Sequence, residues 1–239
     1  MTDNNSSNVT TKEPIEDNRM AQRFRGFYPV IIDVETAGFN AQTDALLEFA
    51  AITTQFDDNG NLIPKNTYFY RIKPFEGSVI VKANIDFIGI DPFDPNRKAF
   101  EEREVFPSFF KSISKEVKAA KCKRAILVGH NANFDHGFIK AVVERIKYKR
   151  DPFHPFSVID TASLAGIFYG QTVLGRAAIT AGLDYKEENA HSALYDTQME
   201  AELFCNMVNR YKDLGGWPLS DEMNKRAEEA VINYTKKTN

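Results

Sequence analysis

The stretch from residue 28 to residue 36, YPVIIDVET, joins an apolar run to two carboxylates and decides the expected fold. Val30 to Ile32 are typical of a buried strand, and Asp33 and Glu35 follow where that strand ends. Because side chains alternate between the faces of a strand, both carboxylates lie on one face. Their desolvation and mutual repulsion are costly unless a cation binds, and oxygen ligands favour Mg²⁺ or Mn²⁺ over zinc. A solvated pair at a strand end is the alternative, since D-x-E alone is a common motif.

Further strands and helices are expected on the carboxyl-terminal side of this stretch. Residues 49–56 and 67–72 predict two strands, and Asp57-Asp58-Asn59-Gly60 predicts the turn that joins them. Short strands are also expected at 125–128 and around 158–159. Helices are expected at 83–90, 100–121, after 131 through 149, after 160 to about 181, 192–214 and from 220. Consecutive strands followed by alternating helices and strands predict an α/β fold, a mixed sheet flanked by helices.

Two later motifs add carboxylates and a histidine. The motif H-N-A-N-F-D, residues 130–135, follows the strand at 125–128, so Asp135 opens a helix near a strand's carboxyl end, where ligand sites gather in α/β sheets. In H-S-A-L-Y-D, His191 and Asp196 are five residues apart, which on a helix separates two side chains by about 140°. We therefore expect His191 in a loop and Asp196 in the helix that follows. That arrangement suits a general base beside a metal ligand.

In this order, D-x-E, H-N-A-x-F-D and H-x₄-D resemble the DEDDh superfamily of 3′→5′ exonucleases, which have a ribonuclease H-like fold. Longer stretches, among them VGHNANFDHGF and AHSALYDT, are most similar to a bacterial exoribonuclease of that superfamily, and the likeness covers about residues 23–220. The resemblance implies one domain with a mixed five-stranded sheet. It also implies two Mg²⁺ ions per subunit, with Mn²⁺ as a substitute, held by Asp33, Glu35, Asp135 and Asp196, with His191 as the base.

The same resemblance implies how the substrate is held. Aromatic stacking of the 3′-terminal bases falls on Phe39, Phe87, Phe134 and Phe156. In the family a glutamate on the segment before Phe87 takes part in base discrimination, whereas the matching position here is Ala83. Core packing is the alternative role for each ring, because the chain has 19 phenylalanines to bury.

The net charge of −3 does not by itself indicate a nucleic-acid-binding protein, but the cations are clustered. One cluster lies between residues 111 and 124, a second between 140 and 150, and a third is formed by Arg23 and Arg25. Solvated helix faces are the alternative for each cluster. We predict an RNA-backbone surface that includes Arg23, Arg25, Lys118 and Arg124. The resemblance implies a homodimer in which this surface on one subunit supplies RNA to the active site of the other.

The expected organisation is a disordered tail at 1–22, an exonuclease domain at 23–220 and a surface helix or tail at 221–239. The polar start lacks the features of a secretory signal, and no apolar run reaches the roughly 20 residues of a membrane span. The two cysteines, Cys122 and Cys205, form no C-x-x-C motif. A cytoplasmic protein without a membrane partner is expected.

The resemblance therefore implies a 3′→5′ exoribonuclease that trims tRNA and other stable RNAs, rRNA precursors among them, by two-metal-ion hydrolysis. A single-stranded DNA exonuclease of the same superfamily is one alternative. An inactive RNA-binding module is another, although such a module is expected to lack at least one of the five site residues. A metal-dependent phosphatase acting on small molecules is the third.

Overall fold

A computed structural model describes residues 18–238, with side chains placed through residue 230. The fold is built on one five-stranded sheet with the order β3-β2-β1-β4-β5, which confirms the predicted mixed sheet. Strands β1, β4 and β5 run parallel, whereas β1–β2 and β2–β3 pair antiparallel. The strands are β1 (Phe27–Thr36), β2 (Leu46–Phe56), β3 (Leu62–Arg71), β4 (Arg124–Gly129) and β5 (Phe153–Asp160).

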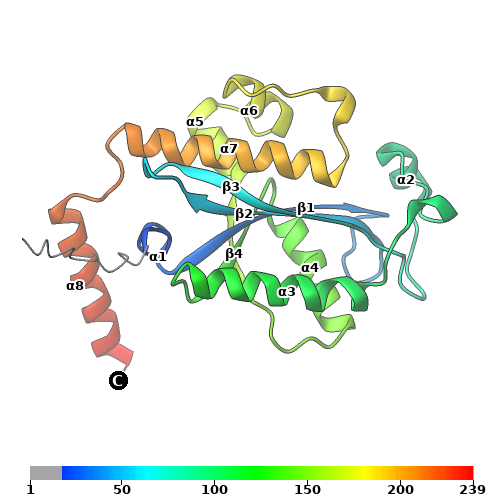
Figure 1. Ribbon diagram of the computed structural model, residues 1–239, viewed down its shortest axis with the longest axis horizontal. Helices are drawn as coiled ribbons and strands as arrows, with labels where there is room; N and C mark the ends of the chain where they lie inside the picture. The colour runs from blue at the N-terminus through cyan, green and yellow to red at the C-terminus, as the bar shows by residue number, and fades with distance from the viewer. Residues whose placement is uncertain (1–17, 239) are drawn as a thin grey trace, which may run out of the picture.

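Helices cover both faces of this sheet (Figure 1). Helices α3 (Glu102–Ala119) and α4 (Asn133–Arg145) lie on one side, and α5 (Thr161–Tyr169), α6 (Leu174–Thr180) and α7 (Ala193–Asp213) lie on the other. The C-terminal helix α8 projects away from the sheet. The remaining elements are α1 (Arg19–Arg23), α2 (Lys82–Ile88), the 3₁₀ turns at Pro95–Arg97 and Glu187–Asn189, and α8 (Asp221–Thr238).

The core forms where α3, α4 and α7 press on the middle of the sheet. Val30, Ile31 and Ile32 of β1 are completely buried, as expected of an apolar run in a central strand covered on both faces. Phe49 contacts Phe106 and Phe109 with ring centroids 5.0 and 4.8 Å apart, so aromatic side chains join β2 to α3. This packing fixes the strand that carries Asp33 and Glu35.

The amino-terminal boundary differs from the prediction. Residues 1–17 of the predicted tail lie outside the described residues, but Arg19–Arg23 form α1 and Met20 is buried against the core. The ordered part of the chain therefore begins before residue 23. Between residues 18 and 238, no helix has both the length and the apolarity to cross a bilayer.

The sheet register places the predicted metal ligands at one end of the sheet. Ile31 pairs with Val128 of the parallel neighbour β4, so Asp33 lies just beyond the paired segment, where the chain leaves β4 for α4. Helix α7 packs across β1, β2 and β3 and begins at the same end. Segments distant in the sequence thus meet at the carboxyl ends of β1 and β4, where ligand sites form in α/β sheets.

Candidate active site

The four predicted metal ligands come from three elements. Asp33 and Glu35 stand on β1, while Asp135 and Asp196 lie in the first turns of α4 and α7. The backbone N–H of Val34 donates to Asp135 Oδ1 at 3.1 Å, which fixes α4 against the end of β1. Oxygen atoms of Glu35 and Asp196 and a ring nitrogen of His191 all lie within 4.8 Å of one another. One metal-sized site therefore receives ligand atoms from β1, α7 and the loop before α7.

His191 lies in the loop before α7, as the spacing to Asp196 predicts. Its backbone N–H donates to Asp196 Oδ2 at 2.9 Å, and its φ of 64° is in the left-handed region. For a residue other than glycine that conformation costs about 1–3 kcal/mol, so it persists where surrounding contacts hold it. The exposed imidazole packs on Phe87, with ring centroids 4.5 Å apart. The ring thus borders both the carboxylates and solvent.

The carboxylates repel one another in a buried setting. Burial, followed by the charge of Asp135, raises the pKa of Asp33 well above its usual range. Burial, with the nearby charges of Asp196, Glu48 and Asp135, raises the pKa of Glu35 to about 8. Burial also raises the pKa of Asp135 to about 8 and raises that of Asp196. In the folded chain, these four carboxyl groups therefore need a nearby positive charge to stay ionised at neutral pH.

Among the side chains that the structure describes, two buried carboxylate oxygens have no hydrogen-bond partner, Asp33 Oδ2 and Glu200 Oε2. Buried polar atoms are nearly always paired, so each exception calls for a missing partner. Every carboxylate here offers oxygen, the donor that Mg²⁺ and Mn²⁺ prefer. The residues present fit a divalent cation.

Glu200 was not predicted from the sequence. It stands on α7 one turn after Asp196, so the two carboxylates share a helix face. Two features of the sequence could have identified Glu200 as a site residue. It comes four residues after the predicted ligand Asp196, and it is a charged residue among the apolar residues of α7, such as Ala201 and Phe204.

We expect the protein without metal to lose stability as the pH rises. A carboxyl group whose pKa is raised on folding stabilises the fold fully below its unfolded pKa, near 4, and this contribution disappears as the pH passes the folded value. For Glu35 and Asp135 that value is about 8. A bound cation offsets the repulsion only when the groups are ionised. The increase in melting temperature from Mg²⁺ over EDTA should therefore be larger at about pH 8.5 than at about pH 5. An equal increase at both values would show that these carboxylates do not bind the ion.

Three of the four predicted stacking residues, Phe39, Phe87 and Phe134, lie beside the carboxylates, whereas no contact joins Phe156 to them. Phe39 and Phe87 are 80% and 67% exposed, and Phe87 contacts His191. Phe39 contacts Phe134, with ring centroids 6.2 Å apart, whereas Phe134 is partly buried and also packs on Phe138. Phe156 is 78% exposed on β5 and contacts the ring of His154 instead. Phe39, Phe87 and Phe156 are therefore exposed rings, whereas Phe134 packs between Phe39 and the core.

The loop that carries Phe39 is held by close packing. A Cβ atom at Gly38 would meet Asp44 Oδ2 at 2.0 Å, so any other residue there would force the buried Asp44 side chain to move. Asp44 Oδ2 accepts the N–H of Asn40, and Arg145 Nη1 of α4 donates to the carbonyl of Ala41 at 3.1 Å.

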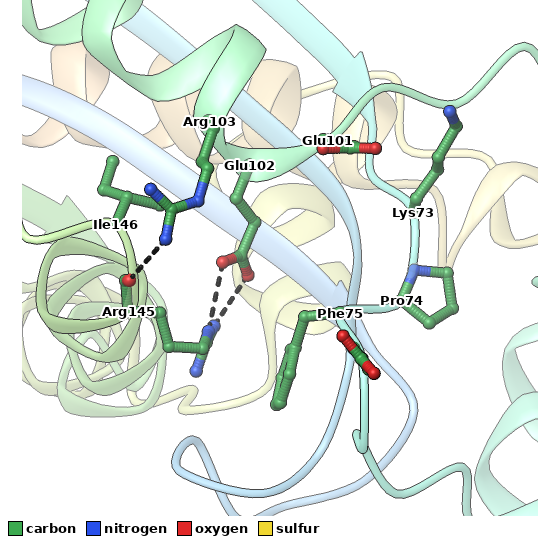
Figure 2. Close-up of a pocket in the computed structure, with 9 residues that line it drawn as sticks. Lys73, Pro74, Phe75, Glu101, Glu102, Arg103, Arg145 and Ile146 are labelled. Atoms are coloured by element: carbon green, nitrogen blue, oxygen red, sulfur yellow. Dashed lines mark hydrogen bonds and ion pairs between the residues drawn. The ribbon is translucent and has the colours of Figure 1, made fainter.

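Arg145 also belongs to a separate cavity of about 560 Å³ (Figure 2). There it pairs with Glu102 at 2.7 Å and lies over the Phe75 ring, 4.3 Å from its centroid. None of the predicted metal ligands lines this cavity. The contacts of Arg145 with Glu102 and with the carbonyl of Ala41 connect α4 to α3 and to the loop of Phe39.

The predicted basic residues lie at the opposite end of β1 and β4 from the carboxylates. Phe27 pairs with Arg124 in the sheet, and Lys123 N donates to the carbonyl of Gly26 at 2.7 Å, so Arg25 lies close to Arg124 along the chain and the sheet. Lys118 and Arg124 line a groove of about 590 Å³. The other cations of that groove are Lys121, Lys123, Lys149 and Arg150.

Arg23 has different surroundings from the other three cations. Its guanidinium lies 5.1, 5.6 and 5.0 Å from the ring centroids of Phe24, Tyr211 and Trp217, and burial lowers its pKa. Arg23 is therefore half-buried among aromatic rings, whereas Arg25, Lys118 and Arg124 are exposed.

Comparison with known proteins gives concordant matches. A family model described as an exonuclease, RNase_T, matches residues 30–204. Ribonuclease T of Vibrio cholerae is 53% identical over 215 residues, which is 90% of this chain and 96% of that relative. Ribonuclease T of Escherichia coli strain K12 is 57% identical over 201 residues, covering 84% of this chain and 94% of that relative.

Solved structures share the fold at lower identity. Escherichia coli exonuclease I in complex with a dT13 oligonucleotide matches with a TM-score of 0.59 and 19% identity, over 80% of this chain and 43% of that chain. A 3′-exonuclease described as recognising the 3′ end of a histone mRNA stem-loop matches with a TM-score of 0.58 and 17% identity, over 77% of this chain and 64% of that chain.

Proposed function

Because this chain belongs to the exonuclease family that includes ribonuclease T, we propose that it removes nucleotides one at a time from the 3′ ends of tRNA and other stable RNAs. The family membership confirms the resemblance seen in the motifs, and it makes the chain a 3′→5′ exoribonuclease that hydrolyses phosphodiester bonds. The observation that carries the proposal is the convergence of Asp33, Glu35, Asp135 and Asp196 at the end of β1. An inactive binding module would not need to retain this set together with His191.

We assign Asp33, Glu35, Asp135 and Asp196 to two Mg²⁺ ions, with Mn²⁺ as a substitute. When bound, such ions supply Lewis acidity to the phosphodiester and to the attacking water. Asp135 is oriented by the N–H of Val34, and Asp196 by the N–H of His191. Both carboxylates are therefore fixed before substrate arrives.

His191 is assigned as the general base. Its ring lies in the same cluster as Glu35 and Asp196, and it is exposed where an attacking water enters. The unprotonated ring nitrogen of an imidazole can accept the proton of that water and then pass it to solvent. The loop position lets the ring turn while Asp196 stays on its helix.

The exposed rings of Phe39, Phe87 and Phe156 are assigned to the unpaired 3′-terminal bases. Stacking tolerates any base, because every base has a π-face, and this suits an enzyme that trims different RNAs. Ala83 lies on α2 one turn before Phe87 and has no side chain that can form a hydrogen bond with a base. Position 83 therefore adds no hydrogen bond to a base, and the stacking rings remain the contacts assigned here.

Replacing Phe39 by alanine should weaken binding of the RNA 3′ end by about 1–3 kcal/mol, which is the cost of removing one stacking interaction. Because the ring is 80% exposed, the melting temperature should stay close to that of the unmodified protein. Fluorescence anisotropy with a short single strand and thermal denaturation would measure the two effects. Ile167→Ala, which removes another exposed apolar side chain, is the matched control. A fall in melting temperature with unchanged affinity would mean that Phe39 is structural.

We further propose a homodimer in which the basic surface of one subunit supplies RNA to the active site of the other. Asp33 comes six positions after Phe27 on β1, a distance of about 20 Å along a strand. Arg25 and Arg124 therefore lie far from their own carboxylates. Two-fold symmetry would place two such surfaces against two active sites.

Mixing two inactive variants tests this arrangement. One variant carries neutral residues at Arg23, Arg25, Lys118 and Arg124, and the other carries Asp33→Asn. In the mixed dimer one intact surface faces one intact site only if they act across the interface, so activity on long RNA should return. For each cation that no longer pairs with a phosphate, the slope of binding against salt should also fall by about 0.7. Lys225→Ala, which removes an exposed cation of α8 outside this surface, is the control and should leave activity unchanged. Absence of recovery after proven subunit exchange would rule the arrangement out.

The substrate assignment is tested with tRNA that carries an unpaired 3′ end and with DNA of the same 3′ sequence. We expect faster release of 3′ nucleotides from tRNA. Faster release from the DNA would favour a single-stranded DNA exonuclease, and hydrolysis of small phosphate esters alone would favour a phosphatase.

Cys122 and Cys205 are both free thiols, which suits the reducing cytoplasm in which we place this activity.

A further inference from the structure

Glu200 is a buried carboxylate that the assignment above leaves without a role. It is only 1% exposed, and none of the described cations forms an ion pair with it. Its Oε1 accepts the backbone N–H of His130 at 2.7 Å, whereas its Oε2 is buried with no partner among the described residues. One carboxylate oxygen of Glu200 therefore has a hydrogen-bond partner among the described residues, and the other has none.

The surroundings of Glu200 are the proposed metal ligands. Glu200 is close enough to Asp135, Asp196 and Asp160 for their negative charges to repel its own, and it repels Asp33 in the same way. Asp33 Oδ2 is the other buried carboxylate oxygen without a partner. Asp160 is accounted for, because its oxygens accept the N–H groups of Ala132 and Ser163. The unsatisfied oxygens thus belong to Asp33 and Glu200, in one acidic cluster.

We propose that Glu200 is a fifth carboxylate of the cation site, with Oε2 facing a divalent ion directly or through one water. The inference rests on the proposed metal-dependent function. Carboxylates set the affinity of oxygen-lined sites through their number and rigidity, so a fifth one strengthens cation binding. Its Oε1 contact also joins α7 to the turn between β4 and α4, which delivers Asp135. Glu200 therefore provides negative charge for the ions and also helps to position Asp135.

The alternative is that Glu200 only accepts the N–H of His130. Glu200→Gln separates the two roles, because the amide keeps one oxygen for His130 and loses the negative charge. If Glu200 serves the cation site, the dissociation constant for Mn²⁺, measured on the full chain by electron paramagnetic resonance, should rise about 10- to 100-fold. Glu202→Gln removes the same charge from an exposed position two residues further along α7, and Mn²⁺ binding should stay unchanged.

The outcomes separate this inference from the proposed function. Equal Mn²⁺ affinity in the unmodified chain and Glu200→Gln would overturn the role of Glu200 alone. Failure of the unmodified chain to bind Mn²⁺ would overturn the metal-dependent function as well. If Glu200→Gln does not fold, anomalous scattering from Mn²⁺ in crystals of the unmodified chain decides. The ion should lie within about 5 Å of Glu200 Oε2, the reach of one bridging water. A larger distance would refute the proposal.

Discussion

Asp33→Asn is expected to reduce nucleotide release to background while RNA binding survives. Asp33 stands at the centre of the acidic cluster, where the charges of Asp135, Glu200 and Glu35 all act on it. Its Oδ2 is buried without a partner among the described residues, so a cation is the counterpart that it lacks. The amide keeps the shape of the carboxylate but removes its charge, and it also relieves repulsion in the metal-free fold.

Two measurements check the Asp33 prediction. Release of label from the 3′ end of an RNA reports turnover, and fluorescence anisotropy with the same RNA reports binding. Asp58→Asn, in the turn after β2, makes the same chemical change away from the site and should leave turnover normal. Release at a near-normal rate by Asp33→Asn would remove Asp33 from the metal site.

His191→Ala should lower the rate by about 10²- to 10⁴-fold, the usual contribution of a general base. Metal binding should persist, because the contact between His191 and Asp196 is made by the backbone N–H and does not need the imidazole. His191 has a positive φ, so His191→Asn is the better second variant, since asparagine tolerates that conformation more readily than alanine.

The readout for His191 is the rate together with the dissociation constant of Mn²⁺. A loss of rate with unchanged Mn²⁺ affinity is the expected result for both variants. Loss of Mn²⁺ binding in both would instead make the imidazole a metal ligand, which its place in the cluster with Glu35 and Asp196 permits. Near-normal turnover would remove His191 from catalysis altogether.

The elements that carry the site could be predicted because their signals are local. The apolar run before Asp33 forms a fully buried strand, and the five-residue spacing of His191 and Asp196 places one in a loop and the other in α7. Strand β5 is harder to delimit. The apolar pattern predicts only residues around 158–159, whereas the strand spans Phe153–Asp160. Its first half contains Pro155, which sheets tolerate at an edge, and the strand order places β5 at one.

The contacts that depend on tertiary packing could not be predicted. Arg23 is visible in the sequence only as a cation near the chain start, but Tyr211 and Trp217 reach it from the far end of the chain. Glu200 follows Asp196 by one turn of α7, and its burial beside Asp33 depends on α7 crossing β1. Phe134 likewise contacts both Phe39 and the core residue Phe138. The spacing of these residues in the sequence does not predict either contact.

Metal-dependent hydrolysis from the 3′ end is tested most directly by digesting a single-stranded RNA, labelled in separate samples at the 5′ or 3′ end, with Mg²⁺ or with EDTA. We predict that Mg²⁺ gives immediate release of the 3′ label as a mononucleotide, while the 5′-labelled strand shortens one nucleotide at a time. EDTA should stop both, because the carboxylates at the end of β1 then lack their cation. Release of the 5′ label first, release of oligonucleotides, or an unchanged rate in EDTA would contradict a metal-dependent 3′→5′ exonuclease.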